Sequence, residues 1–147
     1  MFHALAAAAI LAVATTAATA QDFITYTAND SFEDVTFAVE SAIIAKGLVV
    51  DSVSHVGDML ERTRADMGST VTIFSGADVY QFCSASVSRK VMEDDPMNVR
   101  FCPYGIAVFQ TPGADSVTVG YRTYPAGAMQ EVQALLDSIV KEALMLD

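Results

Sequence analysis

Residues 31–47 read SFEDVTFAVESAIIAKG and predict an amphipathic helix whose two ends are marked in the sequence. Ser31 is a suitable N-cap, and the acidic residues Glu33 and Asp34 favour the positive end of the helix dipole. Gly47 suits the position just after a helix, where the backbone often turns left-handed. The apolar face that the helix must bury consists of Val35, Val39, Ala42 and Ile43.

The segments on either side of this helix have the composition of strands. Residues 23–27 and 48–53 are rich in β-branched and aromatic side chains, which favour extended structure. The chain then predicts a helix at 58–67, a strand at 78–82 preceded by a strand-like stretch at 70–74, a short helix from Ser84 or Ser86 to Asp94, and strands at 99–109 and 116–121.

The last helix has the clearest apolar stripe in the chain. Its members are Val132, Leu135, Leu136, Ile139, Val140, Ala143 and Leu144, and we expect Glu131, Asp137 and Glu142 to face away from it. The predicted order is therefore βαβαβαββα. It indicates an α+β fold in two layers, with helices packed on a mixed, mostly antiparallel sheet.

Residues 1–20 predict a secretory signal peptide. They form an apolar run that ends in Ala18-Thr19-Ala20, a small-x-small cleavage site. We expect residues 21–147 to fold as one soluble, periplasmic or secreted domain, with a retained anchor as the alternative. The formal charge of −10 argues against nucleic acid or an anionic membrane surface as a partner.

Cys83 and Cys102 are the two cysteines of the chain, each preceded by phenylalanine. Outside the cytoplasm such a pair is expected to be oxidised unless it is ligated or kept reduced. Three interpretations stay open: a structural disulfide, two separate buried thiols, and a functional thiol or metal site. If the strands that carry the cysteines were adjacent and parallel, they would lie too far apart for a disulfide. A thioredoxin-like oxidoreductase is disfavoured because the chain has no C-x-x-C motif.

A soft-metal site is the more specific alternative interpretation of the cysteine pair. Thiolate and thioether ligands suit Cu(I), so Cys83 and Cys102 would bind it together with Met92. Met97 and the remote His55 are further donors, although methionine more often serves packing. The spacing of a zinc site is absent from the sequence, and no particular cofactor is indicated.

A second candidate surface combines Tyr104 and Gly105 with residues 121–125, YRTYP. Arg122 lies between two tyrosines, and stacking with bidentate hydrogen bonds would hold a small anionic or aromatic ligand there. The competing interpretation is an ordinary solvated arginine after a strand. Arg89 and Arg100 are notable for the same reason, because the chain has only 8 Lys and Arg against 18 Asp and Glu. No nucleophile elbow or phosphate-binding loop is present, which favours binding over catalysis.

The cysteine region resembles the family known as domain of unknown function DUF302. The similar segments are FCSA at 82–85, SRKVM at 88–92, DDPMN at 94–98 and FCPYGIAVF at 101–109, within a resemblance that extends over residues 23–144. In many relatives the later cysteine follows the proline, whereas here Cys102 precedes Pro103 and Tyr104 takes the following place. The function of the family is not established, so the resemblance supplies no reaction.

The sequence thus predicts an exported domain that binds a small ligand or a protein partner, neither of which it identifies. The candidate ligand-binding residues are Cys83, Cys102, Tyr104, Arg122 and Tyr124. The alternative is a thiol-redox or copper-binding protein that acts through the cysteine pair. A homodimer stays open, and no membrane association is expected once the signal peptide is removed.

Overall fold

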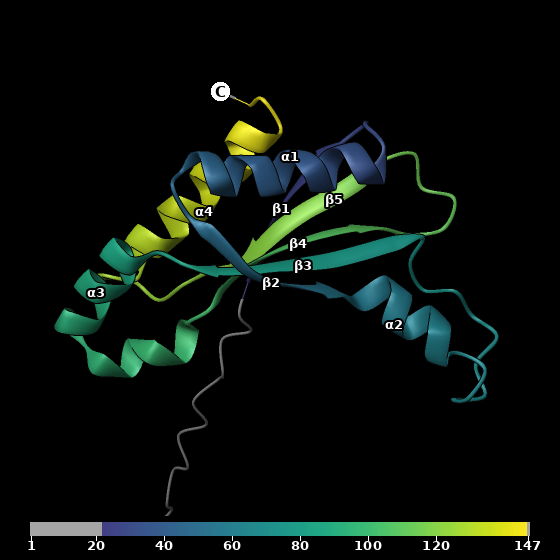
Figure 1. Ribbon diagram of the computed structural model, residues 1–147, viewed down its shortest axis with the longest axis horizontal. Helices are drawn as coiled ribbons and strands as arrows, with labels where there is room; N and C mark the ends of the chain where they lie inside the picture. The colour runs from purple at the N-terminus through teal and green to yellow at the C-terminus, as the bar shows by residue number, and fades with distance from the viewer. Residues whose placement is uncertain (1–21, 147) are drawn as a thin grey trace, which may run out of the picture.

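The computed structural model describes residues 22–146, in which strands and helices alternate along the chain (Figure 1). The elements are β1 (Phe23–Ala28), α1 (Phe32–Ala45), β2 (Val49–His55), α2 (Val56–Thr63), β3 (Gly76–Cys83), α3 (Ala85–Asp94), the 3-10 helix η1 (Pro96–Phe101), β4 (Tyr104–Gln110), β5 (Val117–Arg122) and α4 (Gln130–Ala143). The predicted signal peptide at residues 1–20 lies outside the described residues.

The five strands form one sheet in the order β1-β5-β4-β3-β2. Every neighbouring pair is antiparallel, including β3 and β4, in which Phe82 lies opposite Tyr104. The α+β prediction and the order βαβαβαββα are confirmed, with η1 as an additional short element. Because β3 and β4 run in opposite directions, the end of β3 and the start of β4 meet at the same edge of the sheet.

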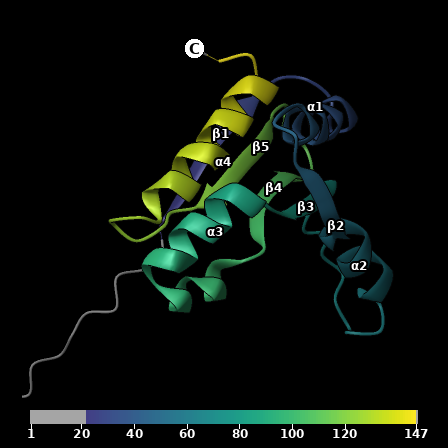
Figure 2. The ribbon, with the colours of Figure 1, turned by 60° about the vertical axis from the view of Figure 1, so that its left-hand side comes forward.

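Helices α1 and α4 pack side by side over one face of this sheet (Figures 1 and 2). The predicted apolar face of α1 is buried, and so are four members of the stripe on α4: Val132, Leu136, Ile139 and Val140. They meet Phe82, Ile106 and Val119 of the sheet, each fully buried. A fully buried side chain of this kind contributes about 1.5–3 kcal/mol relative to an exposed one, so this interface is the main source of stability.

Serine caps begin two of the helices. In α1, Ser31 Oγ accepts a hydrogen bond from the Asp34 N–H at 3.1 Å, and Gly47 follows the helix with φ of 74°. In α3, Ser84 Oγ accepts from the Val87 N–H at 3.3 Å, so Ser84 is the N-cap rather than Ser86. These caps satisfy backbone donors that have no partner inside the helix.

Three predicted boundaries are wrong. Residues 70–74 form no strand, and α2 begins and ends earlier than predicted. The strand predicted at 99–109 begins only at Tyr104, because Pro96 starts η1 in its place. The Asp95 carboxylate accepts from the Met97 N–H at 2.9 Å, and the Asn98 amide donates to the Val91 carbonyl at 2.8 Å, which ties η1 to α3.

The prediction that Asp137 faces away from the core is also wrong. Tyr26 of β1 and Tyr121 of β5 donate hydrogen bonds to its Oδ1 at 2.5 and 2.6 Å, and Lys141 pairs with its Oδ2 at 3.0 Å. Burial opposes the charge of Asp137, but the hydrogen bonds from the tyrosines and Lys141 hold its pKa below the ordinary value. Desolvation and this same carboxylate raise the pKa of Tyr121.

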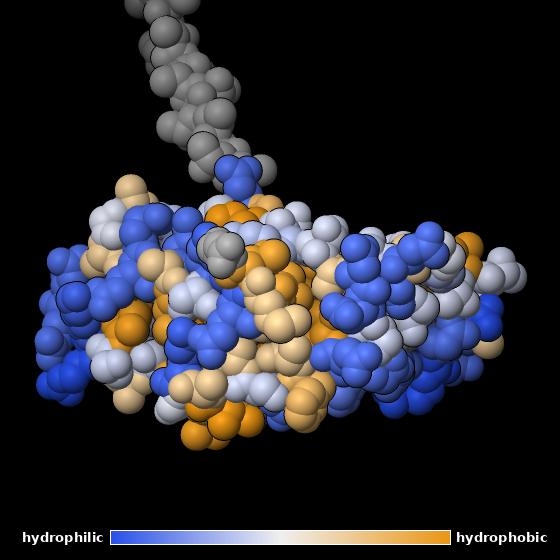
Figure 3. Space-filling model, turned by 90° about the horizontal axis from the view of Figure 1, so that it is seen from above, coloured by the Kyte–Doolittle hydropathy of each residue, from blue (hydrophilic) through white to orange (hydrophobic). Residues whose placement is uncertain are grey.

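Figure 3 looks down on the helical layer, where hydrophobic residues are interspersed with hydrophilic ones. Phe37 and Ile44 of α1 are among the exposed large hydrophobic residues. Within residues 22–146, no helix combines the length and the apolarity needed to cross a membrane.

Candidate functional site

A hollow of about 420 Å³ lies on the face of the sheet opposite α1 and α4. Side chains alternate along β4, so Tyr104, Ile106 and Val108 are buried in the core while Gly105 and Ala107 face the other way. Gly105 and Ala107 line the hollow together with residues of β3. The alternation of the strand therefore separates a packed face from an open one.

The part of the hollow that lies over β4 is lined by the small residues Gly105 and Ala107. A Cβ atom at Gly105 would lie 3.7 Å from Cγ1 of Val79, an ordinary van der Waals distance. Steric crowding is therefore not the reason for glycine at this position. The missing side chain leaves space above β4 that Val79 and Gln81 border from β3.

Aromatic rings form part of the wall. Phe101, the last residue of η1, meets Tyr124 edge-on with ring centroids 5.8 Å apart, and Phe23 of β1 also lines the hollow. Burial raises the pKa of Tyr124 to about 12, with Tyr104 adding to the shift and the positive charge of Arg122 opposing it. The Tyr124 phenol is therefore neutral at physiological pH and adds no negative charge to the site.

Two arginines supply the charge of the hollow. Arg100 comes from η1 and Arg122 from the end of β5, and both are exposed. Among residues 22–146, five of the cations lie within 4.0 Å of a carboxylate: Lys46, Arg64, Arg89, Lys90 and Lys141. Neither Arg100 nor Arg122 has such a partner in the described chain, and Arg100 instead lies 4.7 Å from the centre of the Phe101 ring. No Asp or Glu is among the described residues that line the hollow.

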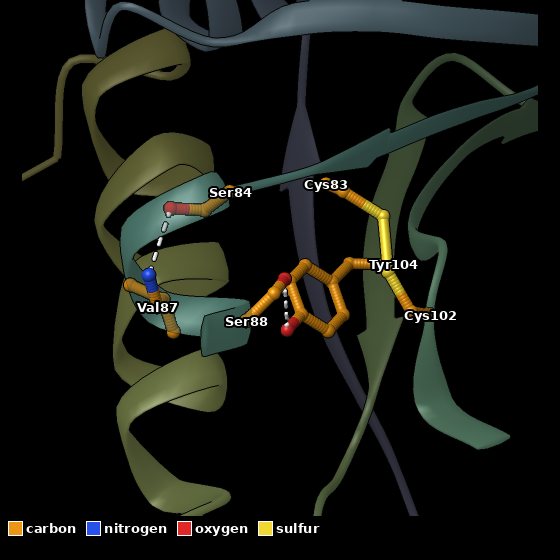
Figure 4. The surroundings of a disulfide bond; sticks show 6 residues. All are labelled: Cys83, Ser84, Val87, Ser88, Cys102 and Tyr104. Atoms are coloured by element: carbon orange, nitrogen blue, oxygen red, sulfur yellow. Dashed lines mark hydrogen bonds between the residues drawn. A yellow bond between two sulfur atoms is a disulfide. The ribbon is translucent and has the colours of Figure 1, made fainter. Parts of the chain in front are cut away.

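Cys83 and Cys102 are joined by a disulfide, with Cα atoms 6.5 Å apart (Figure 4). Of the three interpretations that the sequence left open, the structure therefore has the disulfide. The distance objection assumed parallel strands, whereas β3 and β4 are antiparallel and bring both cysteines to one edge of the sheet. Cys102 lies between Phe101 and Pro103, which both line the hollow, so the disulfide fastens this wall to β3.

Tyr104 belongs to the core rather than to the hollow. Its ring points away from the disulfide toward α3, where its hydroxyl and that of Ser88 form a hydrogen bond of 2.8 Å (Figure 4). The Tyr104 ring still supports the site from behind, since it meets Tyr124 edge-on at 6.2 Å. Of the predicted ligand-binding residues, Arg122 and Tyr124 line the hollow directly, and the disulfide borders it.

The residues suggested for a soft-metal site are dispersed. Met92 packs against the core, Met97 is exposed, and His55 shares a hydrogen bond of 2.7 Å with Asp78. In the part of the chain that the structure describes, no three His, Cys, Asp or Glu side chains gather as metal ligands do. The disulfide also leaves neither cysteine as a thiolate.

Sequence reasoning missed much of the hollow. It placed Gly105 beside Tyr104 in the second candidate surface and noted Arg100 only as a scarce cation. It did not single out Phe23, Phe101 or Ala107 as site residues. The signal for Gly105 and Ala107 was present, because both occupy the alternate positions of an otherwise bulky strand, YGIAVFQ. No local pattern joins Phe23 to Phe101, since Phe23 reaches the hollow through the pairing of β1 with β5 and Phe101 reaches it from η1.

The fold and the site define a two-layer α+β domain, with α1 and α4 on one sheet face and an arginine-lined hollow on the other. The chain belongs to the family described as "Domain of unknown function DUF302", whose model matches residues 24–144. It is similar in structure to an uncharacterized conserved DUF302 protein from Bacillus stearothermophilus, with 14% sequence identity and a TM-score of 0.60. The similarity covers 84% of this chain and 95% of the other. No curated protein matches the chain.

Proposed function

We propose that this domain binds a small organic anion in the hollow on the open face of its sheet. One observation carries the proposal: in a chain with a net charge of −10, Arg100 and Arg122 both line one hollow and neither is paired with a carboxylate in residues 22–146. An unpaired guanidinium presents several donors in a fixed geometry that matches a carboxylate or phosphate. Charge complementarity therefore favours an anionic occupant.

The size and lining of the hollow agree with a small molecule. Its volume of about 420 Å³ is near the lower end of the roughly 300–1,000 Å³ of small-molecule sites. The described lining offers neither a carboxylate nor a histidine as a general base. Binding without chemistry is therefore the function that these residues support.

The proposed place of action is the periplasm or the cell exterior, after removal of residues 1–20. The Cys83–Cys102 disulfide supports this location, because disulfides persist in oxidising compartments and are rare in the cytosol.

The disulfide also supports a second candidate, a thiol-redox role for the same two residues. Both cysteines are only partly buried, so an external dithiol can approach them. In this candidate the dithiol is oxidised to its own disulfide while Cys83 and Cys102 become thiols, and Cu(I) is a ligand that only this reduced form can take. Anion binding is favoured, because it uses the two arginines, whereas the redox candidate leaves them without a role.

A thermal-shift screen with carboxylic and phosphoric acids of different classes tests anion binding. The Gly105→Leu variant fills the hollow without a backbone clash, since the nearest neighbour of a Cβ atom there is a side-chain atom at 3.7 Å. Acids that raise the melting temperature of the natural protein should fail to raise that of Gly105→Leu, because a ligand stabilises only the form that binds it. The control Arg62→Gln removes an exposed arginine outside the hollow and should leave the response unchanged.

Two outcomes contradict the proposal. In the first, no acid stabilises the natural protein at millimolar concentration. In the second, Gly105→Leu is stabilised as strongly as the natural protein. Circular dichroism confirms beforehand that the variant has kept its fold.

A further inference from the structure

We infer that the ligand of this hollow is an aromatic compound that carries two negative charges, either as two carboxylates or as one doubly ionised phosphate. The inference rests on the proposed function, because it names the class of molecule that the same hollow takes. It is drawn from the combination of aromatic rings and two guanidinium groups in the lining of the hollow.

The expectation of an aromatic ligand follows from the rings that line the hollow. Phe23, Phe101 and Tyr124 all line the hollow. The Phe23 ring lies over Gly120 of the neighbouring strand, where a Cβ atom would overlap it. Phe101 is held between the Arg100 guanidinium and the edge of Tyr124. Rings that already pack against neighbouring groups lose less conformational entropy when a flat ligand covers them, and aromatic contacts favour such a ligand beyond the area they bury.

The expectation that the ligand carries two negative charges follows from the two arginines. Arg100 and Arg122 belong to different elements, η1 and β5, and reach the hollow from separate parts of the chain. A ligand with a single negative charge balances only one of the two guanidinium charges, whereas a dianion balances both. The neutral Tyr124 phenol and the uncharged floor of Gly105 and Ala107 place no negative charge against the second acid group.

Competing classes of anion fit less well. A nucleic acid brings an extended row of phosphates toward a chain with a net charge of −10, and only two arginines lie at the hollow to offset it. An aliphatic dianion satisfies the guanidinium groups but gains less from the three rings. One ring with two charges matches both parts of the lining.

Isothermal titration calorimetry with four probes tests the inference at neutral pH and low salt. The probes are benzoate, isophthalate, phenyl phosphate and the saturated cyclohexane analogue of isophthalate. We expect isophthalate, phenyl phosphate or both to bind about tenfold more tightly than benzoate, since a second charge-assisted contact contributes about 1.4 kcal/mol. The dianion that binds more tightly shows whether the hollow prefers two carboxylates or one phosphate. Isophthalate should bind several-fold more tightly than its saturated analogue.

Single substitutions assign this preference to the arginines. Arg100→Gln and Arg122→Gln should each reduce the affinity for the preferred dianion about tenfold and bring it close to that for benzoate. Arg62→Gln serves as the matched control and should keep the full preference. All three side chains are exposed, so the substitutions leave the core intact.

The outcomes separate this inference from the proposed function. Equal affinity for benzoate and both dianions overturns the double charge, and equal affinity for isophthalate and its saturated analogue overturns the aromatic requirement. If only aliphatic acids stabilise the natural protein, and not Gly105→Leu, the ligand class is wrong while the site stands. If no acid of any class binds, both proposals fail.

Discussion

Asp137 links α4 to two strands of the sheet through a single carboxylate. Its Oδ1 accepts hydrogen bonds from Tyr26 and Tyr121, which lie on the neighbouring strands β1 and β5. Lys141, one turn later on α4, balances the charge. Hydrogen bonds to an ionised acceptor are stronger than those between neutral groups. This residue therefore fixes how the last helix sits on the edge of the sheet.

The lowered pKa of Asp137 predicts how stability depends on pH. A carboxylate whose pKa is lower in the folded state stabilises the fold above its unfolded pKa, about 3.9, and loses this contribution as the pH falls through the folded pKa. Asp137→Asn should cost about 1 kcal/mol at neutral pH. The difference from the natural protein should shrink in acid, as measured by urea unfolding across pH.

The exposed Asp66→Asn substitution is the control, and it should change stability little at any pH. If the deficit of Asp137→Asn instead stays constant down to strong acid, the charge of Asp137 does not contribute to stability.

Helix α1 combines a buried face with a well-formed start. Ser31 accepts a hydrogen bond from the Asp34 N–H and donates one to the Asp34 carboxylate at 2.7 Å. The capped start and the buried face both belong to the sequence of the helix itself, which is why this element was predictable in position, ends and burial.

Ser31→Ala should lower the free energy of unfolding by about 1 kcal/mol, because it leaves backbone donors of the first turn without their acceptor. Ser41→Ala, in the exposed middle of the same helix, is the matched control. It should be neutral or slightly stabilising, because alanine has the higher helix propensity. Equal effects of both substitutions in urea unfolding would show that the cap is not responsible.

The stretch at 96–103 shows where local reasoning fails at the level of an element. Val99 and Phe101 favour strands, yet both lie in η1. The Asp95–Met97 and Asn98–Val91 hydrogen bonds outweigh that preference. The second of these is a tertiary contact with α3, and no pattern within the segment predicts it.

Over the whole molecule, the disulfide closes the connection between β3 and β4. Reduction should lower the free energy of unfolding by about 3 kcal/mol in the chain-entropy model, since a loop with a sequence separation of 19 gains freedom only when unfolded. Urea unfolding with and without a dithiol measures this difference. The unfolded natural protein should show no free thiol before reduction.

The double variant Cys83→Ser/Cys102→Ser provides the control, because its stability should not respond to the dithiol. Two free thiols in the unreduced protein, or equal stability with and without the dithiol, would contradict the disulfide.

How much of the molecule was predictable depends on whether the information is local. The order of elements, the apolar helix faces and the candidates Arg122 and Tyr124 follow from short patterns. The strand order β1-β5-β4-β3-β2 does not, and it places Phe23 and Arg122 opposite each other from distant parts of the chain. The site is assembled by that pairing, so only part of it was visible in the sequence.

The disulfide makes residues 83–102 a covalently closed ring that carries α3 and η1. Arg89 and Lys90 lie exposed within α3 on this ring, so a trypsin-like protease can cut there when the helix unfolds locally. A single cut there leaves the two fragments joined through sulfur, so the nicked protein remains one covalent molecule until it is reduced. The helical wall beside the hollow is therefore retained after such a cut.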